Sequence, residues 1–275
     1  EPESEPEPVD DDAAVEGLFA RLRADRAEKV AHAEAVLAAP APDVADEVEA
    51  APEPQAAPVP DEATPDLAVL AARDERLAAD ERALVRALKR SLADEQNEVL
   101  DALRRLRGAP TVATLLPDRA AHDARFESVL AGGVATAAAA GGDVAGGDGG
   151  RADEVATELG RSVATDLRAR VERAVEEASG DVETLAEAIS SAYREWKTAR
   201  AEPLARDAIT AGFAAGMYAA SSGTLRWVVD PAEGGCPDCD DNVLAGATAK
   251  GATYPTGQLH PPAHAGCRCV VVTAS

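Results

Sequence analysis

The chain has 275 residues, of which 50 are acidic and 27 are basic, and its formal net charge is −23. Binding to duplex DNA or to an anionic membrane surface requires basic residues, so this charge argues against direct nucleic-acid binding and membrane association. Aromatic residues make up only 3% of the chain. Because alanine-rich segments with regularly spaced leucine and valine pack best as helices, we expect a mainly α fold.

Residues 1–63 are acidic and rich in Pro, Ala and Glu. Residues 1–13 have little to bury, and the repeated prolines of residues 39–64 prevent a continuous helix. Between these segments, apolar residues recur at three- and four-residue steps and predict one short helix. The first of them are Val15, Leu18, Phe19 and Leu22. We therefore expect residues 1–63 to be largely disordered apart from this helix.

Residues 64–140 are expected to form a long helix followed by a weaker one. Thr64 can cap the first helix, and Pro65 suits its first turn. One apolar stripe follows the long helix and ends before Gly108. It consists of Leu67, Leu70, Leu77, Leu84, Leu88, Leu92, Val99, Leu103 and Leu106. Some of these leucines are heptad-spaced but Ser91 breaks the series, so both a short coiled coil and packing in a helical bundle stay open.

Residues 141–150 are glycine-rich and predict a flexible linker, because no Gly-Lys-Ser/Thr follows that would indicate a phosphate-binding loop. Residues 151–223 show three more amphipathic patterns, which predict a helical bundle. The third pattern, over residues 204–217, is rich in Ala and Gly. We interpret these small residues as a site of close helix packing.

Residues 224–275 differ from the rest of the chain. Leu225, Trp227 and Val229 alternate along one predicted strand, and residues 269–273 form a second, so a β-hairpin is expected. This tail has too few apolar residues to fold by hydrophobic burial alone.

All four cysteines and two of the four histidines lie in this tail. Zn²⁺ prefers four tetrahedral sulfur or nitrogen ligands, and two paired clusters joined by a loop are the usual structural solution. The predicted metal ligands are Cys236, Cys239, His264, Cys267 and Cys269. His260 is a weaker candidate, since it precedes two prolines. The sequence thus predicts a small zinc knuckle at the C-terminus, in which six candidates compete for four positions.

Other interpretations of the cysteines stay open. Two disulfides would require an oxidising compartment, and a thioredoxin-like redox site would require a βαβ pattern that is not visible. His32-Ala33-Glu34 together with the cysteine pair matches part of a zinc deaminase motif. A nuclease would use His260 or His264 as a base and Asp240 or Asp241 to hold a metal ion. We rank all of these below a structural zinc site and expect no enzymatic activity.

The tail resembles the phage head-morphogenesis family of Mu F-like minor head proteins. The similarity covers about residues 180–275 and is carried by three features. These are the small-residue helix, the strand Arg226-Trp227-Val228-Val229-Asp230, and the Cys-Pro-x-Cys and His-x-x-Cys-Arg-Cys motifs. This chain has Ala265 after His264, where the family usually has proline, so the identity of the ligating histidine stays open.

This resemblance implies a non-catalytic minor component of a phage procapsid that binds portal or scaffold proteins. The first 150 residues do not match that family and are loosely similar to DivIVA-type polar coiled-coil proteins. The alternatives are therefore a bacterial division or polarity scaffold that carries a phage-derived tail and self-associates, and a metal-dependent hydrolase. We expect a cytoplasmic protein, or a virion protein if a prophage encodes it.

Overall fold

The computed structural model describes residues 65–233 and 236–274. The predictions for residues 1–63, Thr64 and the His32-Ala33-Glu34 motif lie outside these residues. The described part is mainly helical and ends in a small antiparallel sheet with a cysteine cluster, which confirms the mainly α class.

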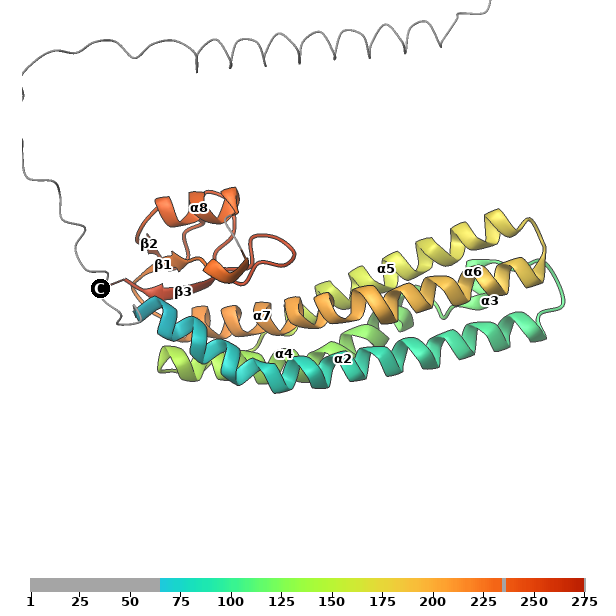
Figure 1. Ribbon diagram of the computed structural model, residues 1–275, viewed down its shortest axis with the longest axis horizontal. Coiled ribbons are helices and arrows are strands. Elements are labelled where there is room, and N and C mark those ends of the chain that lie inside the picture. The colour runs from blue at the N-terminus through green and yellow to red at the C-terminus, as the bar shows by residue number, and fades with distance from the viewer. Residues whose placement is uncertain (1–64, 234–235, 275) are drawn as a thin grey trace, which may run out of the picture. The chain divides into compact units, whose positions relative to one another are not determined.

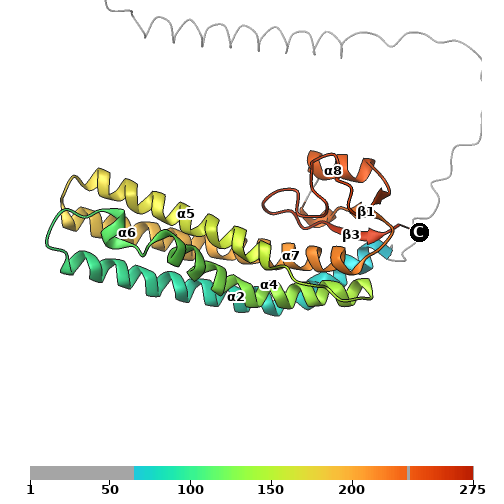
Figure 2. The same ribbon diagram turned by 180° about the vertical axis from the view of Figure 1, so that it is seen from behind.

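In the described part of the chain, four long helical rods form a bundle, and successive rods run in opposite directions (Figures 1 and 2). The short helix α3 (Val112–Leu115) connects the first rod to the second. In chain order, the rods are α2 (Pro65–Arg105), α4 (Arg119–Ala145), α5 (Asp153–Ala178), and α6 (Val182–Glu195) continued through the π-helical turn η1 (Trp196–Arg200) into α7 (Ala201–Ala220).

Local signals set several of the helix boundaries. Pro65 is the first residue of α2, as predicted. Asp118 caps α4 by accepting the backbone N–H of Ala121, and Asp181 caps α6 in the same manner. These side chains satisfy backbone donors that lack a partner in the first helical turn.

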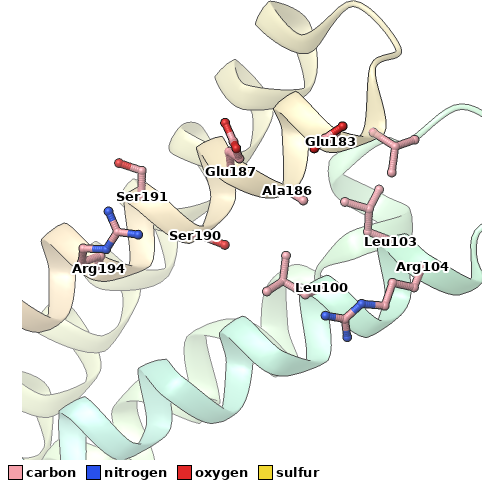
Figure 3. A pocket seen from close by; sticks show the side chains of 10 residues that line it. Leu100, Leu103, Arg104, Glu183, Ala186, Glu187, Ser190, Ser191 and Arg194 are labelled. Atoms are coloured by element: carbon pink, nitrogen blue, oxygen red, sulfur yellow. The ribbon is translucent and has the colours of Figure 1, made fainter.

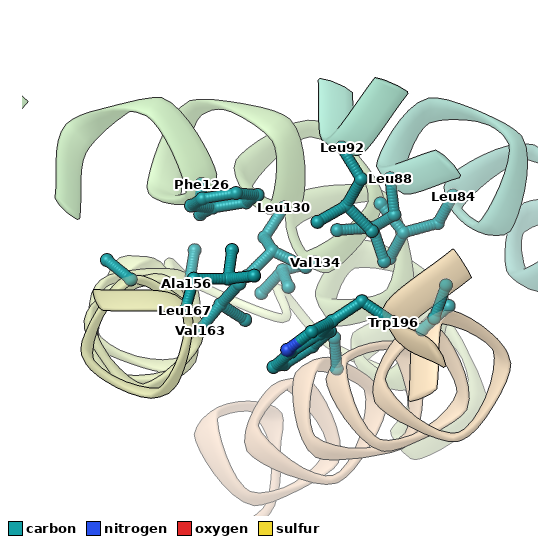
Figure 4. Packing of buried hydrophobic residues seen from close by; sticks show 14 of the residues in the cluster. Leu84, Leu88, Leu92, Phe126, Leu130, Val134, Ala156, Val163, Leu167 and Trp196 are labelled. Carbon is teal, nitrogen blue, oxygen red and sulfur yellow. The ribbon is translucent and has the colours of Figure 1, made fainter. Parts of the chain in front are cut away.

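The leucine stripe of α2 lies in the core of the bundle. Leu77 and Leu88 are fully buried. Figure 4 shows Leu84, Leu88 and Leu92 facing residues of the neighbouring helices, among them Leu130 of α4. Of the two interpretations left open for this stripe, packing within the bundle of the chain itself is therefore the one observed.

The predicted linker at 141–150 is wrong in its first half, because α4 continues to Ala145. Gly141 is buried against α7, and a Cβ atom at this position would lie 2.1 Å from the carbonyl oxygen of Phe213. The absence of a side chain thus allows close helix packing here. The helix ends only at Gly146, which adopts the left-handed conformation (φ 80°) that favours glycine.

The small residues of α7 confirm the predicted close packing. A Cβ atom at Gly216 would lie 1.9 Å from the carbonyl oxygen of Ala138 in α4. The second and third amphipathic patterns of residues 151–223 form one continuous helical rod. The π-helical turn η1 joins them, and the Arg200 guanidinium lies 5.2 Å from the centre of the Trp196 ring.

The tail contains three strands where a hairpin was expected. Strand β1 (Thr224–Val228) lies in the centre and pairs antiparallel with both β2 (Thr248–Ala249) and β3 (Val270–Thr273). Trp227 is paired with Val271. The two predicted strands are therefore correct, but they pair across a long insertion.

That insertion contains a helix that the sequence analysis missed. After the short 3₁₀ helix η2 (Pro231–Glu233), α8 spans Pro237–Leu244. The Cys-Pro-Asp-Cys segment begins this helix, because Pro237 at the first helical position and Asp238 in the first turn are both favourable at a helix start.

The tail is packed onto the bundle and forms one compact unit with it. Strand β3 contacts α7, and Arg226 of β1 forms an ion pair with Asp66 of α2. The fully buried side chain of Arg73 in α2 lies 2.6 Å from the carboxylate of Asp230. The predicted domain boundaries at residues 151 and 224 therefore lie inside one structural unit.

Helix α4 is long and apolar enough to cross a membrane by length and composition. In this structure it contacts α2, α5 and α7, and its residues Phe126, Leu130 and Val134 are buried in the bundle core. The three neighbouring helices therefore cover these apolar side chains of α4.

Candidate metal centre

The five predicted ligands come from two short segments. Cys236 precedes α8 as its N-cap, and Cys239 lies in the first turn of this helix. Residues three apart in a helical turn lie on the same face, so both sulfur atoms are directed to one side. Cys239 is 1% exposed, whereas Cys236 is partly exposed.

The second segment is the loop that leads into β3. The N–H of Cys267 donates a hydrogen bond to the carbonyl oxygen of His264, with Gly266 in the left-handed conformation (φ 79°) between them. Cys267 and Cys269 are both buried, and His264 is exposed at the edge of the cluster. A tight turn thus places three candidate ligands opposite the start of α8.

The structure groups these residues into two overlapping triads that share Cys239. One contains Cys236, Cys239 and His264, the other Cys239, Cys267 and Cys269, and the ligand atoms of each triad lie within 4.8 Å of one another. All five predicted ligands are therefore close together in a cluster that is compatible with a metal site.

The distances from the shared Cys239 sulfur match those of a tetrahedral site. The Sγ atom of Cys239 lies 3.7 Å from the Sγ atom of Cys267 and 3.5 Å from Nε2 of His264. In a tetrahedron with Zn–S bonds of about 2.3 Å and Zn–N bonds of about 2.05 Å, the S···S edge is about 3.8 Å and the S···N edge about 3.6 Å. A cation can therefore bind these ligands with little rearrangement.

The same distances argue against disulfides. A disulfide bond joins its sulfur atoms at about 2.05 Å, well below the 3.7 Å between Cys239 and Cys267. All four cysteines are free thiols in this structure.

The two tail histidines have different surroundings. Nδ1 of His264 lies 2.7 Å from the carbonyl oxygen of Ala265, so this nitrogen must carry the proton and donate it. Nε2 of His264 then directs its lone pair toward the cysteines, which is the arrangement of a metal-ligating histidine. His260 belongs to neither triad, and its ring packs 4.8 Å from the ring of Tyr218.

Local interactions shift the thiol pKa values in opposite directions. A hydrogen bond from Cys269 is the largest influence that lowers the pKa of Cys267 to about 5, and the backbone N–H of Cys239 lowers the pKa of Cys236. Burial raises the pKa of Cys239 to about 12, and the hydrogen bond to Cys267 followed by burial raises that of Cys269. A bound divalent cation would favour the ionised form of all four thiols.

The sequence analysis missed the residues that hold the ligand loop in place. Asp207 of α7 accepts the N–H of Gly266 at 3.0 Å, and burial raises the pKa of this carboxyl group. Arg268, between the last two cysteines, contacts Asp74 at 2.6 Å and Glu81 at 3.4 Å on α2. These contacts join residues far apart in the chain, so they leave no pattern in the sequence. The only local hint of them is the arginine between two cysteines.

Of the residues of the nuclease alternative, His264 lies with the cysteines, but the two aspartates and His260 do not. Asp240 and Asp241 are exposed on α8, and neither belongs to the metal-binding triads found among the described residues. His260 packs on Tyr218, as described above.

A separate groove of about 620 Å³ lies between the end of α2 and the start of α6 (Figure 3). Leu100 and Leu103 of α2 line this groove together with charged side chains, among them Arg104, Glu187 and Arg194. None of its lining residues belongs to the cysteine cluster.

The fold and the cluster together define a class: a four-rod helical bundle with a small C-terminal sheet and a Cys/His cluster that is compatible with a metal ion. No family model, no curated protein and no solved structure matches the chain.

Proposed function

We propose that the protein is a non-catalytic assembly module in which a structural zinc ion holds the C-terminal tail together and fixes it to the helical bundle. The observation that carries this proposal is the agreement of the Cys239–Cys267 and Cys239–His264 distances with the edges of a zinc tetrahedron. The donor set of cysteine and histidine also favours zinc over magnesium or calcium, which prefer oxygen ligands.

The buried polar contacts suggest what the metal ion stabilises. Binding would fix the loop that contains Arg268, and this loop contacts Asp74 and Glu81 of α2. Arg73 also donates a hydrogen bond to the backbone oxygen of Arg268. Because metal binding energy becomes folding energy when the apo site is not preformed, zinc would stabilise the attachment of the tail to α2.

The closed character of the cluster supports a structural role. Structural zinc sites use four protein ligands, whereas catalytic sites use three and leave one position for water. Five sulfur and nitrogen donors surround this site, which is enough to fill four positions. A metal-dependent hydrolase therefore remains the weaker alternative.

The partners remain a proposal that rests on the resemblance of residues 180–275 to phage minor head proteins. We propose portal-like or scaffold-like proteins as partners, in the cytoplasm or in an assembling virion. A coiled-coil polarity scaffold is less well supported, because Leu77 and Leu84 of the heptad-spaced stripe are buried in the bundle of the chain itself.

Elemental analysis of the purified chain with matched histidine variants tests the metal site. We expect one zinc ion per chain, and we expect Cys239→Ser and His264→Ala to reduce the zinc content and make the tail sensitive to protease. His260→Phe should retain zinc, because His260 lies outside both triads. Unchanged zinc content in Cys239→Ser would reject this ligand assignment.

Chelation separates the structural role from the catalytic alternative. We expect a chelator to loosen the tail, measured by limited proteolysis, while the helical content of the bundle changes little. A phosphodiester-hydrolysing activity that disappeared on chelation before any structural change would contradict the proposal.

A further inference from the structure

The indole of Trp227 is buried beside the cysteine cluster without an oxygen or nitrogen acceptor. Trp227 is 2% exposed, and its Nε1 atom has no hydrogen-bond partner. Its ring contacts Tyr254 edge-on at 5.0 Å, but the Tyr254 hydroxyl group donates to the backbone oxygen of Leu225. A buried N–H group without an acceptor destabilises the folded state, so this indole calls for an acceptor nearby.

The register of the sheet places one cysteine next to this indole. Trp227 is paired with Val271 across β1 and β3, and Cys269 precedes Val271 by two positions. Residues two apart along an extended strand lie on the same face, and the diagonal neighbour is within reach of a long aromatic side chain. Trp227 and Cys269 also belong to the same buried cluster.

We infer that Trp227 is a positioning residue of the metal centre, whose unpartnered indole N–H donates a hydrogen bond to the Cys269 thiolate when a metal ion is bound and so holds this sulfur as a metal ligand. The inference rests on the proposed zinc site.

This role follows from the chemistry of metal thiolates. A buried thiolate with no donor other than its metal concentrates negative charge on sulfur, and a nearby N–H group stabilises that charge. Groups that contact metal ligands in this way fix their orientation, and their loss typically weakens metal binding about 10–100-fold. The position of Trp227 thus supports Cys269 as one of the four metal ligands. The other three ligands would then come from the four remaining candidates.

Substitution of the two tryptophans provides a matched test. Trp227→Phe removes the N–H donor but keeps an aromatic ring, and we expect zinc affinity, measured by competition with a chromogenic chelator, to fall about 10–100-fold. Trp196→Phe makes the same chemical change at another buried indole nitrogen without a partner, but in the bundle. We expect this variant to bind zinc as the natural chain does.

A spectroscopic measurement keeps the inference testable if Trp227→Phe folds poorly. In the natural chain loaded with ¹¹³Cd, the indole Hε1 proton of Trp227 should show scalar coupling to the metal through the Cys269 sulfur. Trp196→Phe identifies the Trp227 signal, because only one indole then remains. Cys269→Ser should abolish the coupling.

The outcomes distinguish this inference from the proposed function. If the chain binds no zinc, the proposed metal site itself fails. If the chain binds zinc, but Trp227→Phe matches Trp196→Phe in affinity and no coupling from Hε1 to ¹¹³Cd appears, the role of Trp227 is overturned while the metal site stands.

Discussion

At the scale of single residues, glycines determine how closely α4 and α7 approach each other. Gly141 and Gly216 lie against backbone atoms of the opposite helix, where no side chain fits. Gly132, on the same helix α4, has no atom within 4 Å of the position a Cβ atom would take. The same residue type is therefore required at two positions and dispensable at the third.

We expect Gly216→Ala to destabilise the bundle by about 1–3 kcal/mol, because the new methyl group would overlap with the carbonyl oxygen of Ala138. Gly132→Ala should instead stabilise it by about 0.5–1 kcal/mol through its higher helix propensity. Urea unfolding monitored by circular dichroism compares the two variants. Equal stability of both would show that the two helices are not in close contact.

At the scale of elements, α2 is an amphipathic helix whose apolar stripe forms part of the bundle core. Leu77 is fully buried, whereas Leu67 near its start is 44% exposed. The stripe therefore contributes to folding through burial within one chain. Self-association, if it occurs, requires another surface.

Leu77→Ala should lower the free energy of unfolding by about 2–5 kcal/mol, since the cavity it leaves adds to the lost apolar burial. Leu67→Ala should change it by less than about 0.5 kcal/mol. Thermal unfolding gives the stabilities, and sedimentation velocity gives the oligomeric state. A Leu77→Ala chain that stayed fully stable but changed its oligomeric state would indicate an intermolecular role for the stripe.

At the scale of the whole molecule, buried charges connect the tail to the bundle. Arg73 is completely buried and contacts Asp230, which is only 7% exposed. Burial raises the pKa of Asp230, but the hydrogen bond from Arg73, the N–H of Ala232 and the charges of Arg73 and Arg268 together lower it below its usual value of 3.8. The pair therefore favours the charged carboxylate in the folded state.

Asp230→Asn should destabilise the tail by about 3 kcal/mol, because it leaves the buried Arg73 charge without this partner. Asp66→Asn, which affects the more exposed pair with Arg226, should cost less than about 1 kcal/mol. Hydrogen exchange of the β1–β3 amides measures both effects. Similar protection in the two variants would show that the buried pair does not hold the tail.

The effect of pH on the stability of the tail has a defined direction. Because the pKa of Asp230 is lowered in the folded state, its contribution to stability is fully present above about pH 3.8 and is lost as the pH falls through its folded value. We expect the natural chain to lose tail stability over this acidic range, and Asp230→Asn to lose less. A steeper acid dependence in the variant would contradict this assignment.

The sequence by itself determined the local features. The spacing of apolar residues predicted α2 nearly to its boundaries and further helices within residues 151–223, because burial on one helix face leaves a periodic pattern. The grouping of Cys236, Cys239, His264, Cys267 and Cys269 gave the composition of the cluster, since metal ligands must be of particular types and lie close together.

Only the tertiary structure decided which residues meet across long separations. Gly141 appeared to belong to a flexible linker because glycine has high intrinsic freedom, yet contact with α7 keeps it helical. The contact of Arg268 with Asp74 depends on how the tail packs against α2. Neither partner carries a local signal of the other, because the energy of such a contact depends on proximity in space and not on spacing along the chain.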